Sequence, residues 1–412
     1  MKKIVVFALF VFGMAAANSA SADNVRGINI DFVTISNAGN TGDTRAETYP
    51  SGCGAVGYNY RIGKYEVTNA QWNAFTDVAG APTGDQSYAY DQSALFIGAQ
   101  QPTNMVSWYE TLQFCNYLTS GDKSKGVYQF SGNNSNPGDF LGINRAAAQA
   151  AYGTIYFLPT EDEWYKAAYY KPDGSGYSTY ANGEESIPAA DNGWNYDGGS
   201  YSEPWNVGTG TMEQNGTFDM MGNVWEWNES LLVANTYFLT GFYRVLRGGC
   251  YLNTDGVLGS PVSSYYSHWQ FNDEGSHIGF RVASVPEPTI DALVDINPDS
   301  INKNSKGQWV TVYITLPAGY DVAKIDASTI AITSLTGTSC QPDYHQALDL
   351  SFTPQVGDRD EDGIPDLTVK FNRQELIANL CLDDVAVTVE GKLFTGEHFK
   401  GIDHIRVIDR GK

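Results

Sequence analysis

The chain has 412 residues, with 47 acidic side chains against 25 basic ones, and a formal net charge of −22. This balance excludes nucleic acid and an anionic membrane surface as natural partners, because both are bound through Lys and Arg. It favours solubility and the binding of divalent cations. Aromatic residues make up 13% of the chain, which argues against intrinsic disorder and indicates a packed protein.

The N-terminus has the pattern of a secretory signal peptide. A short basic start precedes an apolar run that extends to Ala17, and small residues then lead to Asp23. This pattern predicts removal of residues 1–22, so the mature protein would be secreted or periplasmic. The apolar run is too short to span a bilayer, and no later stretch reaches the ~20 apolar residues of a spanning helix. We therefore expect no membrane span.

Three short helices are predicted by their N-terminal caps. Thr68, Ser107 and Thr160 are each followed three residues later by Gln or Glu, so each hydroxyl can cap a backbone amide while the later side chain reaches back. The helices are expected to begin at residue 69 and to cover residues 108–118 and 161–170. Long loops rich in Gly, Asn and Ser separate them. A domain with so little regular structure needs another means of holding its loops.

Two prolines mark the clearest domain boundary. Pro286 and Pro288 flank a single residue and exclude a helix there, so we expect a linker over residues 285–292. Residues 25–284 would form one domain. Residues 293–412 contain runs typical of β-strands and are expected to form a small all-β sandwich.

Five cysteines are spread over the chain, at positions 53, 115, 250, 340 and 381. An oxidising compartment permits disulfides. We expect one between Cys340 and Cys381, which share the C-terminal segment, although sequence alone does not fix a pairing. Cys115 lies on the apolar face of an expected helix and is interpreted as a buried small hydrophobe.

Five sequence blocks then carry a family resemblance. They read YRIGKYEVTN (60–69), PTNMVSW (102–108), LPTEDEW (158–164), DMMGNVWEW (219–227), and RGG (247–249) followed by GFR (279–281). In this order and at this spacing they resemble the formylglycine-generating-enzyme, or sulfatase-modifying factor, family. The resemblance covers residues 25–284. It implies an α+β fold, a variant of the C-type lectin fold with a small antiparallel sheet, a few helices and long irregular loops.

The fourth block implies a calcium site. In the family, the positions that match Asp219 and Glu226 supply side-chain oxygens, and those that match Gly222 and Val224 supply backbone carbonyls. Carboxylates and carbonyls are the ligands that calcium prefers. A bound ion would tie down loops that bury little apolar surface. In the alternative interpretation, the tryptophans of the block are core aromatics and Glu226 caps a turn.

The cysteine pair that performs the family's chemistry is missing. Active members carry two cysteines just after the Gly-Gly block, which bind copper and use oxygen to oxidise a substrate cysteine. Copper(I) is held by thiolates. The first position falls here on Asn253 and the second near Val257 or Leu258, while Cys250 is a single thiol that stands three residues too early. We expect no catalytic residue and no copper, hence a pseudoenzyme. The alternative is an active formylglycine-generating oxidase that uses Cys250 in another way.

The histidines bear on a second branch of the fold, the iron-dependent sulfoxide synthases. That branch needs a separate His-rich helical domain for iron, and the five scattered histidines of this chain provide none. His268 and His277 have no plausible metal or nucleophile partner in the sequence. We interpret both as structural.

A ligand-binding surface is implied beside the lost catalytic positions. In folds of this type, the surface between the Gly-Gly block and the GFR strand often binds ligands, and some relatives bind other proteins there. We assign to it Asn253, Tyr265, Tyr266, His268 and Trp269, because rigid amphipathic rings are favoured in binding surfaces. The alternative is that some of these rings face the core, since strand alternation turns about half of them inward.

The C-terminal module resembles one found at the ends of other exported proteins, and it holds a second candidate calcium loop. Asp358, Asp360, Asp362 and Asp366, with the carbonyl of Ile364, alternate before and after a glycine that allows a sharp turn. The alternative is a solvated acidic turn. The sequence as a whole predicts a secreted, calcium-stabilised ligand-binding or adhesion-type protein whose partner is an extracellular protein, peptide or glycan.

Overall fold

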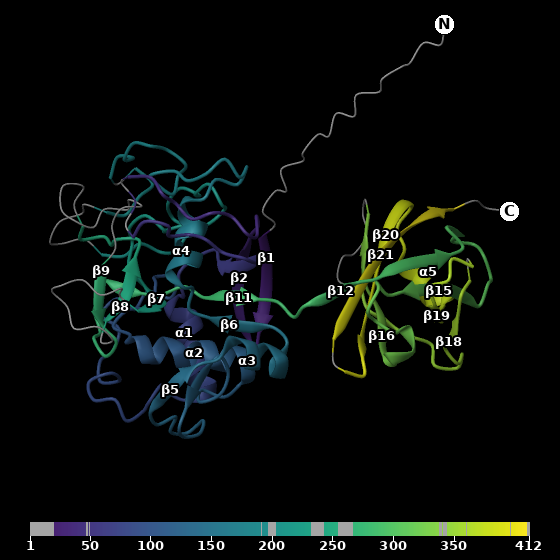
Figure 1. Cartoon of the computed structure of the whole chain (residues 1–412), viewed down its shortest axis with the longest axis horizontal. Coiled ribbons are helices and arrows are strands. Elements are labelled where there is room, and N and C mark those ends of the chain that lie inside the picture. Colours follow the sequence, from purple (N-terminus) through teal and green to yellow (C-terminus); the bar gives the residue numbers. More distant parts are fainter. Residues whose placement is uncertain are drawn as a thin grey trace, which may run out of the picture. The chain divides into compact units, whose positions relative to one another are not determined.

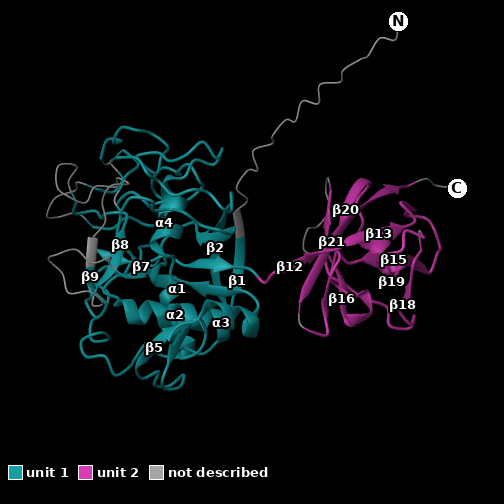
Figure 2. Ribbon diagram, in the orientation of Figure 1, with its two compact units in different colours: residues 1–286 teal, residues 287–412 magenta. Residues whose placement is uncertain are grey.

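The chain forms two compact units, residues 1–286 and 287–412 (Figure 2). The computed structural model describes residues 20–46, 48, 50–190, 192–196, 203–231, 243–253, 267–337, 340, 344–359, 361–395 and 397–409. The two units divide between Pro286 and Glu287. Strand β11 (Ala283–Val285) ends just before this point, and β12 (Thr289–Asp291) begins just after it. The segment between strands is therefore shorter than the linker expected over residues 285–292.

The first sheet of unit 1 joins segments that are far apart in the sequence. Its five strands run in the order β1-β2-β3-β11-β6, and all neighbours are antiparallel. Figure 1 labels β1, β2, β11 and β6 of this sheet. Their bounds are Ala20–Val25 for β1, Ile28–Ile35 for β2, Tyr60–Gly63 for β3 and Ile155–Phe157 for β6, with β11 as above. β1 begins at Ala20, which precedes the predicted cleavage point. Export itself stays a prediction.

The second sheet of unit 1 carries parts of the fourth and fifth sequence blocks. Its order is β10-β7-β8-β9, with β10 parallel to β7 and the other pairs antiparallel. The bounds are Trp225–Leu231 for β7, Tyr243–Arg247 for β8, Ser267–Gln270 for β9 and Ile278–Gly279 for β10. A small antiparallel pair of β4 (Tyr128–Phe130) and β5 (Phe140–Ile143) precedes this sheet in the chain.

The three predicted helices are present, and their caps are the predicted ones. They are α1 (Asn69–Ala79), α2 (Trp108–Ser120) and α4 (Glu161–Tyr169). Each begins with a complete capping box. α2 ends at Gly121, whose φ of +85° suits a residue without a Cβ. A further helix, α3 (Arg145–Tyr152), was not predicted.

Unit 1 has one hydrophobic core in which large aromatic side chains dominate. Trp108, Trp164 and Trp227 are among its largest fully buried side chains. The indole of Trp108 donates to the carbonyl of Asn228, and that of Trp227 donates to the carbonyl of Val106, both at 3.0 Å. These bonds satisfy the polar ends of buried rings. They also fix the block at 102–108 against β7.

The described residues of unit 2 form two sheets and one short α-helix. The larger sheet runs β12-β21-β20-β16-β17, with β14 also paired to β21, and the smaller runs β13-β15-β19-β18. Residues from both sheets form a single hydrophobic cluster. The remaining bounds are Leu293–Asn297 (β13), Ser300–Asn302 (β14), Trp309–Thr315 (β15), Val322–Lys324 (η2, a 3-10 turn), Ile325–Thr336 (β16), Gln346–Ala347 (β17), Gln355–Gly357 (β18), Asp366–Asn372 (β19), Arg373–Asn379 (α5), Asp383–Leu393 (β20) and His398–Ile408 (β21).

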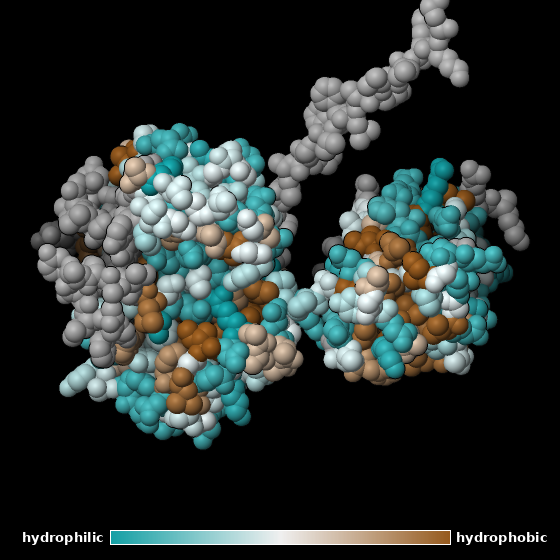
Figure 3. Space-filling view, in the orientation of Figure 1, coloured by the Kyte–Doolittle hydropathy of each residue, from teal (hydrophilic) through white to brown (hydrophobic). Residues whose placement is uncertain are grey.

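Helices and sheets therefore occur together, and the mixed α and β class is confirmed. The finer assignments, a C-type-lectin variant and a sandwich, stay predictions. On the face shown in Figure 3, polar and apolar residues are interspersed over both units. No helix in the described part of the chain is long and apolar enough to cross a membrane.

Candidate functional site

The loop that precedes β7 is fixed to the Gly-Gly block by backbone contacts. The amide of Gly222 donates to the carbonyl of Gly248, and the amide of Tyr251 donates to the carbonyl of Asn223, both at 2.9 Å. Gly222 has a φ of +105°, and a Cβ there would lie 2.3 Å from the carbonyl oxygen of Asn195. Only glycine fits this approach.

A fully buried ion pair holds the centre of unit 1. The guanidinium of Arg281 donates to both carboxylate oxygens of Glu226, at 2.6 and 2.7 Å, and neither side chain is exposed. The indole of Trp164 donates to the same carboxylate at 2.7 Å. Arg281 also donates to the carbonyls of Gly63 and Phe218, at 3.0 and 2.9 Å. Arg281 thus connects β7, β3 and the loop before β7, and Trp164 joins α4 to the same carboxylate.

Three more carboxyl groups lie buried around this pair. Glu66 accepts a hydrogen bond from the amide of Asn223 through Oε1, and Glu213 accepts one from the hydroxyl of Thr217 through Oε2. The other oxygen of each is buried without a partner. Burial raises the pKa of Glu213 to about 8 and that of Asp219 to about 6, and it raises that of Glu66 well above its usual range. This region has more buried carboxylate than cation.

The predicted calcium ligands sit in this region. Asp219 and Glu226 are close enough for the charge of Glu226 to raise the pKa of Asp219, and Gly222 and Val224 lie between them in the chain. The orphaned oxygens of Glu66 and Glu213 fit a hard cation nearby, since such a cation takes oxygen ligands. Among the residues that the structure describes, no group of three or more His, Cys, Asp or Glu side chains could hold a metal ion. Calcium binding stays a prediction. It would need the backbone carbonyls of Gly222 and Val224 as ligands in addition to the carboxylates.

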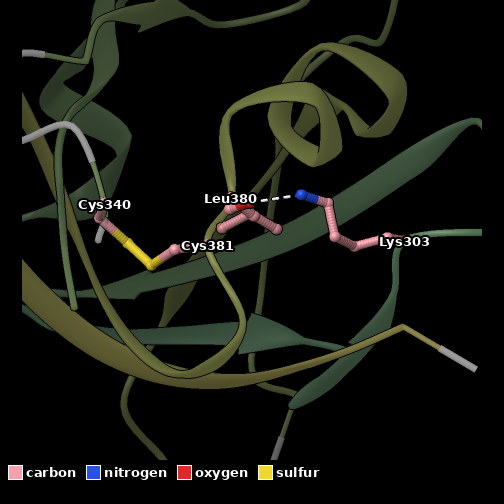
Figure 4. Close-up of a disulfide and its surroundings, with 4 residues drawn as sticks. All are labelled: Lys303, Cys340, Leu380 and Cys381. Carbon is pink, nitrogen blue, oxygen red and sulfur yellow. Dashed lines mark hydrogen bonds between the residues drawn. A yellow bond between two sulfur atoms is a disulfide. The ribbon is translucent and has the colours of Figure 1, made fainter. Parts of the chain in front are cut away.

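All five cysteines of the chain are described, and none offers an exposed thiol. Cys340 and Cys381 form the expected disulfide, and Figure 4 shows it next to Leu380, whose carbonyl accepts a hydrogen bond from Lys303. The other three are free and buried. Burial raises the pKa of the Cys250 thiol to about 12 and raises those of the other two as well. A thiol that keeps its proton is a poor nucleophile and a poor metal ligand.

The residue at the first catalytic position performs a structural task. The side-chain oxygen of Asn253 accepts a hydrogen bond from the backbone amide of Cys250 at 2.8 Å. The backbone amide of Asn253 donates to the carbonyl of Cys250 at 3.0 Å. These two bonds close the turn after the Gly-Gly block. The second catalytic position, near Val257 or Leu258, lies outside the described residues.

The predicted ligand surface is described in part. Trp269 lies in β9 and is half-buried. Its ring lies edge-on to that of His277, with 5.2 Å between the ring centres. His268 is described only as a backbone position opposite Val245, and Tyr265 and Tyr266 lie outside the described residues. Trp269 packs against the core of unit 1, as the alternative of inward-facing rings anticipated.

Sequence reasoning missed Arg244, which stands opposite Trp269 in the neighbouring strand. Its side chain is only 8% exposed, and its guanidinium lies over the ring of Trp108, 3.7 Å from the ring centre. It donates to the carbonyl of Glu229 at 2.7 Å, while its Nε is buried without a partner. No signal in the sequence pointed to it, because Trp108 is distant along the chain.

In unit 2, the second candidate calcium loop is closed by its own hydrogen bonds. Both carboxylate oxygens of Asp358 accept backbone amides, from Asp362 and Gly363, and the carboxylate of Asp362 accepts the amide of Ile364. Asp366 accepts the hydroxyl of Thr315 and the amide of Arg359. These are the contacts of an acidic turn, and Asp360 lies outside the described residues. A cation in this loop stays a prediction.

Comparison with known proteins places the resemblance on firm ground. Residues 35–285 match the sulfatase-modifying factor enzyme 1-like domain. Chaperone protein LppX of Paenibacillus barcinonensis is 25% identical over 303 residues, which cover 68% of this chain and 99% of that protein. Hercynine oxygenase of Mycolicibacterium smegmatis is 28% identical over 218 residues, and the chain spans about half the length of that enzyme, 47%. Treponema denticola variable protein 1, a solved structure, is 23% identical with a TM-score of 0.46 and covers 65% of this chain and 99% of its own.

Proposed function

We propose that this chain, which belongs to the family of sulfatase-modifying factor enzyme 1-like domains, is an exported ligand-binding protein. Its ligand would bind beside the Gly-Gly block, on the surface that includes Asn253 and Trp269. The scaffold would be retained without the family's oxidase chemistry.

The state of the five cysteines carries this proposal. The reaction of active members needs two reactive thiols that bind copper, and here one pair is joined in unit 2 while the remaining three thiols are buried. Asn253 takes the place of the first catalytic thiol and uses its side chain to close a turn. These observations support a scaffold without thiolate chemistry.

The identity of one relative favours a protein as the ligand. LppX is named a chaperone, and its alignment covers nearly all of its length. A chaperone acts by contact with other proteins, and half-buried aromatic side chains such as Trp269 are suited to that contact. An exported protein or peptide is the ligand that we propose, with a glycan as the other outcome of the test below.

The binding proposal is tested with a protein and glycan array probed with the full chain. We expect retention on a small set of proteins, and loss of that retention in the Trp269→Ala and Tyr265→Ala variants. Tyr320→Ala is the matched control, because Tyr320 is a half-exposed aromatic residue of unit 2. If both unit 1 variants retain every interaction of the wild type, the surface is wrongly assigned.

The alternative function, an active oxidase that uses Cys250, has its own test. Copper and oxygen are added to the protein together with a cysteine-containing peptide, and formylglycine is measured by mass spectrometry. We expect no turnover, because the Cys250 thiol is buried and keeps its proton. Turnover that is abolished by Cys250→Ser would overturn the proposal.

We also propose that calcium stabilises unit 1 through Asp219, Glu226 and the carbonyls of Gly222 and Val224. Support comes from the surplus of buried carboxylate, because a divalent cation would neutralise groups that otherwise need protons. Calcium that binds only the folded state raises the melting temperature with its concentration. Asp219→Asn is the matched variant, since Asn tolerates the φ of +63° at this position.

The calcium test is a thermal melt with added calcium or with chelator, together with calorimetric titration. We expect the chelator to lower the melting temperature of the wild type and to leave that of Asp219→Asn almost unchanged. For the acidic loop of unit 2 we expect a second, weaker binding event that is lost in Asp362→Asn. A wild-type melt that is indifferent to the chelator rejects calcium in both places.

Export is proposed on the N-terminal pattern and is tested directly. The chain is expressed with its own N-terminus in a bacterial host, and the protein recovered outside the cytoplasm is sequenced by mass spectrometry. We expect it to begin at Asp23. Recovery of the whole chain in the cytoplasm would contradict the proposal.

A further inference from the structure

Four arginines of unit 1 differ in their partners. Arg281 pairs with Glu226 at 2.6 Å, Arg247 pairs with Glu161 at 2.5 Å, and Arg145 pairs with a glutamate at 2.8 Å. Each of these charges is matched by a carboxylate. Arg244 is 8% exposed, where the first two are fully buried, and it forms no ion pair with any described residue.

The contacts of Arg244 leave one edge of its guanidinium unused. Nη1 donates to the backbone carbonyl of Glu229 at 2.7 Å, and the flat face lies on the ring of Trp108. Nε is buried and donates to nothing. Nη2 makes no hydrogen bond to a described residue either. The Nε–Nη2 edge is the one whose parallel N–H groups match the two oxygens of a carboxylate.

An unmatched buried cation is unfavourable for folding. Removing a charge from water costs free energy that only a partner charge or hydrogen bonds offset. Stacking on Trp108 and one carbonyl offset part of that cost. Burial lowers the pKa of Arg244 to about 10, which still leaves it charged at neutral pH. The carboxylate of Glu229 lies close enough for its charge to act on Arg244, but it does not pair with the guanidinium, so the described residues offset the buried charge only in part.

The place of Arg244 in the sheet connects it to the proposed ligand surface. It is directly opposite Trp269 across β8 and β9, so the two side chains lie on the same face, and β9 is the edge strand of this sheet. Tyr109 lies nearby, because the Arg244 charge acts on its phenol, whose pKa burial raises to about 12. Tyr109 and the rings of Trp108 and Trp269 thus lie around Arg244.

Charge along the sequence singles out the same residue. Between Arg247 and Arg281 the chain has no Lys or Arg, and between Lys64 and Lys123 it has none. These stretches contain the proposed ligand surface and the helix that carries Trp108 and Tyr109. Among the described residues of β8 and of these stretches, Arg244 is therefore the cation without an ion pair, and the net negative charge of the chain opposes anions elsewhere.

We propose that Arg244 binds a carboxylate of the ligand through its Nε–Nη2 edge. The carboxylate would be the C-terminus or an acidic side chain of a protein ligand, with an apolar neighbour placed against Trp269. This inference rests on the proposed function, whose surface it shares. A highly charged polyphosphate is disfavoured by the net charge of −22.

The experiment uses the full chain and defined probes in calorimetric and thermal titrations. The probes are N-acetyl-Gly-Phe as the free acid, the same dipeptide as the amide, glucuronate, and inorganic phosphate, each to about 10 mM. We expect the free acid to bind and to raise the melting temperature, and the amide to do neither. Binding of glucuronate in place of the peptide acid would identify a sugar as the source of the carboxylate. Binding of phosphate alone would overturn the proposal.

Variants at Arg244 test the role of the two parallel N–H donors at Nε and Nη2. Arg244→Gln should weaken binding of the free acid at least about tenfold, and Arg244→Lys should weaken it less, because Lys keeps the charge without the two parallel donors. Equal binding by wild type and Arg244→Gln contradicts the proposal. If array ligands still depend on Trp269 in that case, the proposed function stands and only the carboxylate fails.

A stability measurement separates ligand binding from a structural role. Without ligand, Arg244→Met should melt within about 3 °C of the wild type, because it removes an unmatched charge together with one hydrogen bond. The matched control, Arg281→Met, should melt far lower, because it strands Glu226. If Arg244→Met fails to fold or melts as low as the control, Arg244 serves the fold and the proposal is wrong.

Discussion

Different kinds of interaction stabilise the interior of each of the two units. Unit 1 has short strands and long loops, and its buried ion pairs join segments far apart in sequence, as Arg281 does when it reaches the carbonyl of Gly63. Unit 2 has long strands, of which β20 and β21 have 11 residues each, and one disulfide. Unit 1 thus adds buried polar contacts between distant segments to its aromatic core, whereas unit 2 combines the alternating apolar side chains of long strands with one covalent bond.

The largest effect is expected from breaking the central ion pair. Glu226→Ala leaves the guanidinium of Arg281 buried without its carboxylate, and such a change costs about 3–5 kcal/mol. We expect unit 1 to unfold at much lower urea concentration while unit 2 is unchanged. Hydrogen exchange followed by mass spectrometry resolves the two units.

The control for this prediction removes both charges. Glu226→Met combined with Arg281→Met leaves no stranded ion, so the double variant should be more stable than Glu226→Ala. A loss below about 1 kcal/mol in Glu226→Ala would show that the ion pair does not hold unit 1.

A smaller effect, confined to unit 2, is expected from removing the disulfide. The bridge closes a separation of 41 residues, and replacing Cys340 and Cys381 by Ala should lower the free energy of unfolding of unit 2 by about 2–4 kcal/mol. Urea unfolding of the oxidised and reduced wild type gives the matched comparison. Unit 1 should be indifferent to reduction, because its three cysteines are free. A reduced protein whose unit 1 unfolds first would contradict the division of roles.

Local features of the fold could be predicted from the sequence, and features that depend on distant segments could not. The capping boxes at Thr68, Ser107 and Thr160 are all present, because a cap needs only residues three positions apart. The short strands of unit 1 gave no such signal. β10 has two residues and pairs with β7, which lies about fifty residues earlier, so no local pattern defines it.

The same distinction applies to the candidate site. The sequence blocks identified Glu226, but they could not show that its carboxylate is held by Arg281 and Trp164. They placed Asn253 where the catalytic thiol is missing, and the bond to the amide of Cys250 shows what replaces it. The sequence did not identify Arg244, because its packing on Trp108 and its lack of a paired carboxylate among the described residues are seen only in the folded structure.

The smallest effect is a pH dependence that belongs to unit 1 alone. Lys166 of α4 is fully buried, and its ammonium donates to the carbonyl of Asn37 at 2.9 Å. Burial lowers its pKa to about 8 from an ordinary value of 10.5. Below pH 8 the lysine is charged in both the folded and the unfolded chain, and the full cost of burying the charge is present.

As pH rises from 8 to 10.5, the folded protein releases this proton before the unfolded chain does. The unfolded chain then holds more protons, so the free energy of unfolding of unit 1 rises, by up to about 3 kcal/mol. Lys166→Met removes the group and should show no such rise, which separates it from tyrosines that titrate in the same range. The free energy of unfolding is measured by urea unfolding at each pH. If it depends on pH equally in wild type and variant, Lys166 is hydrated and burying its charge costs unit 1 little stability.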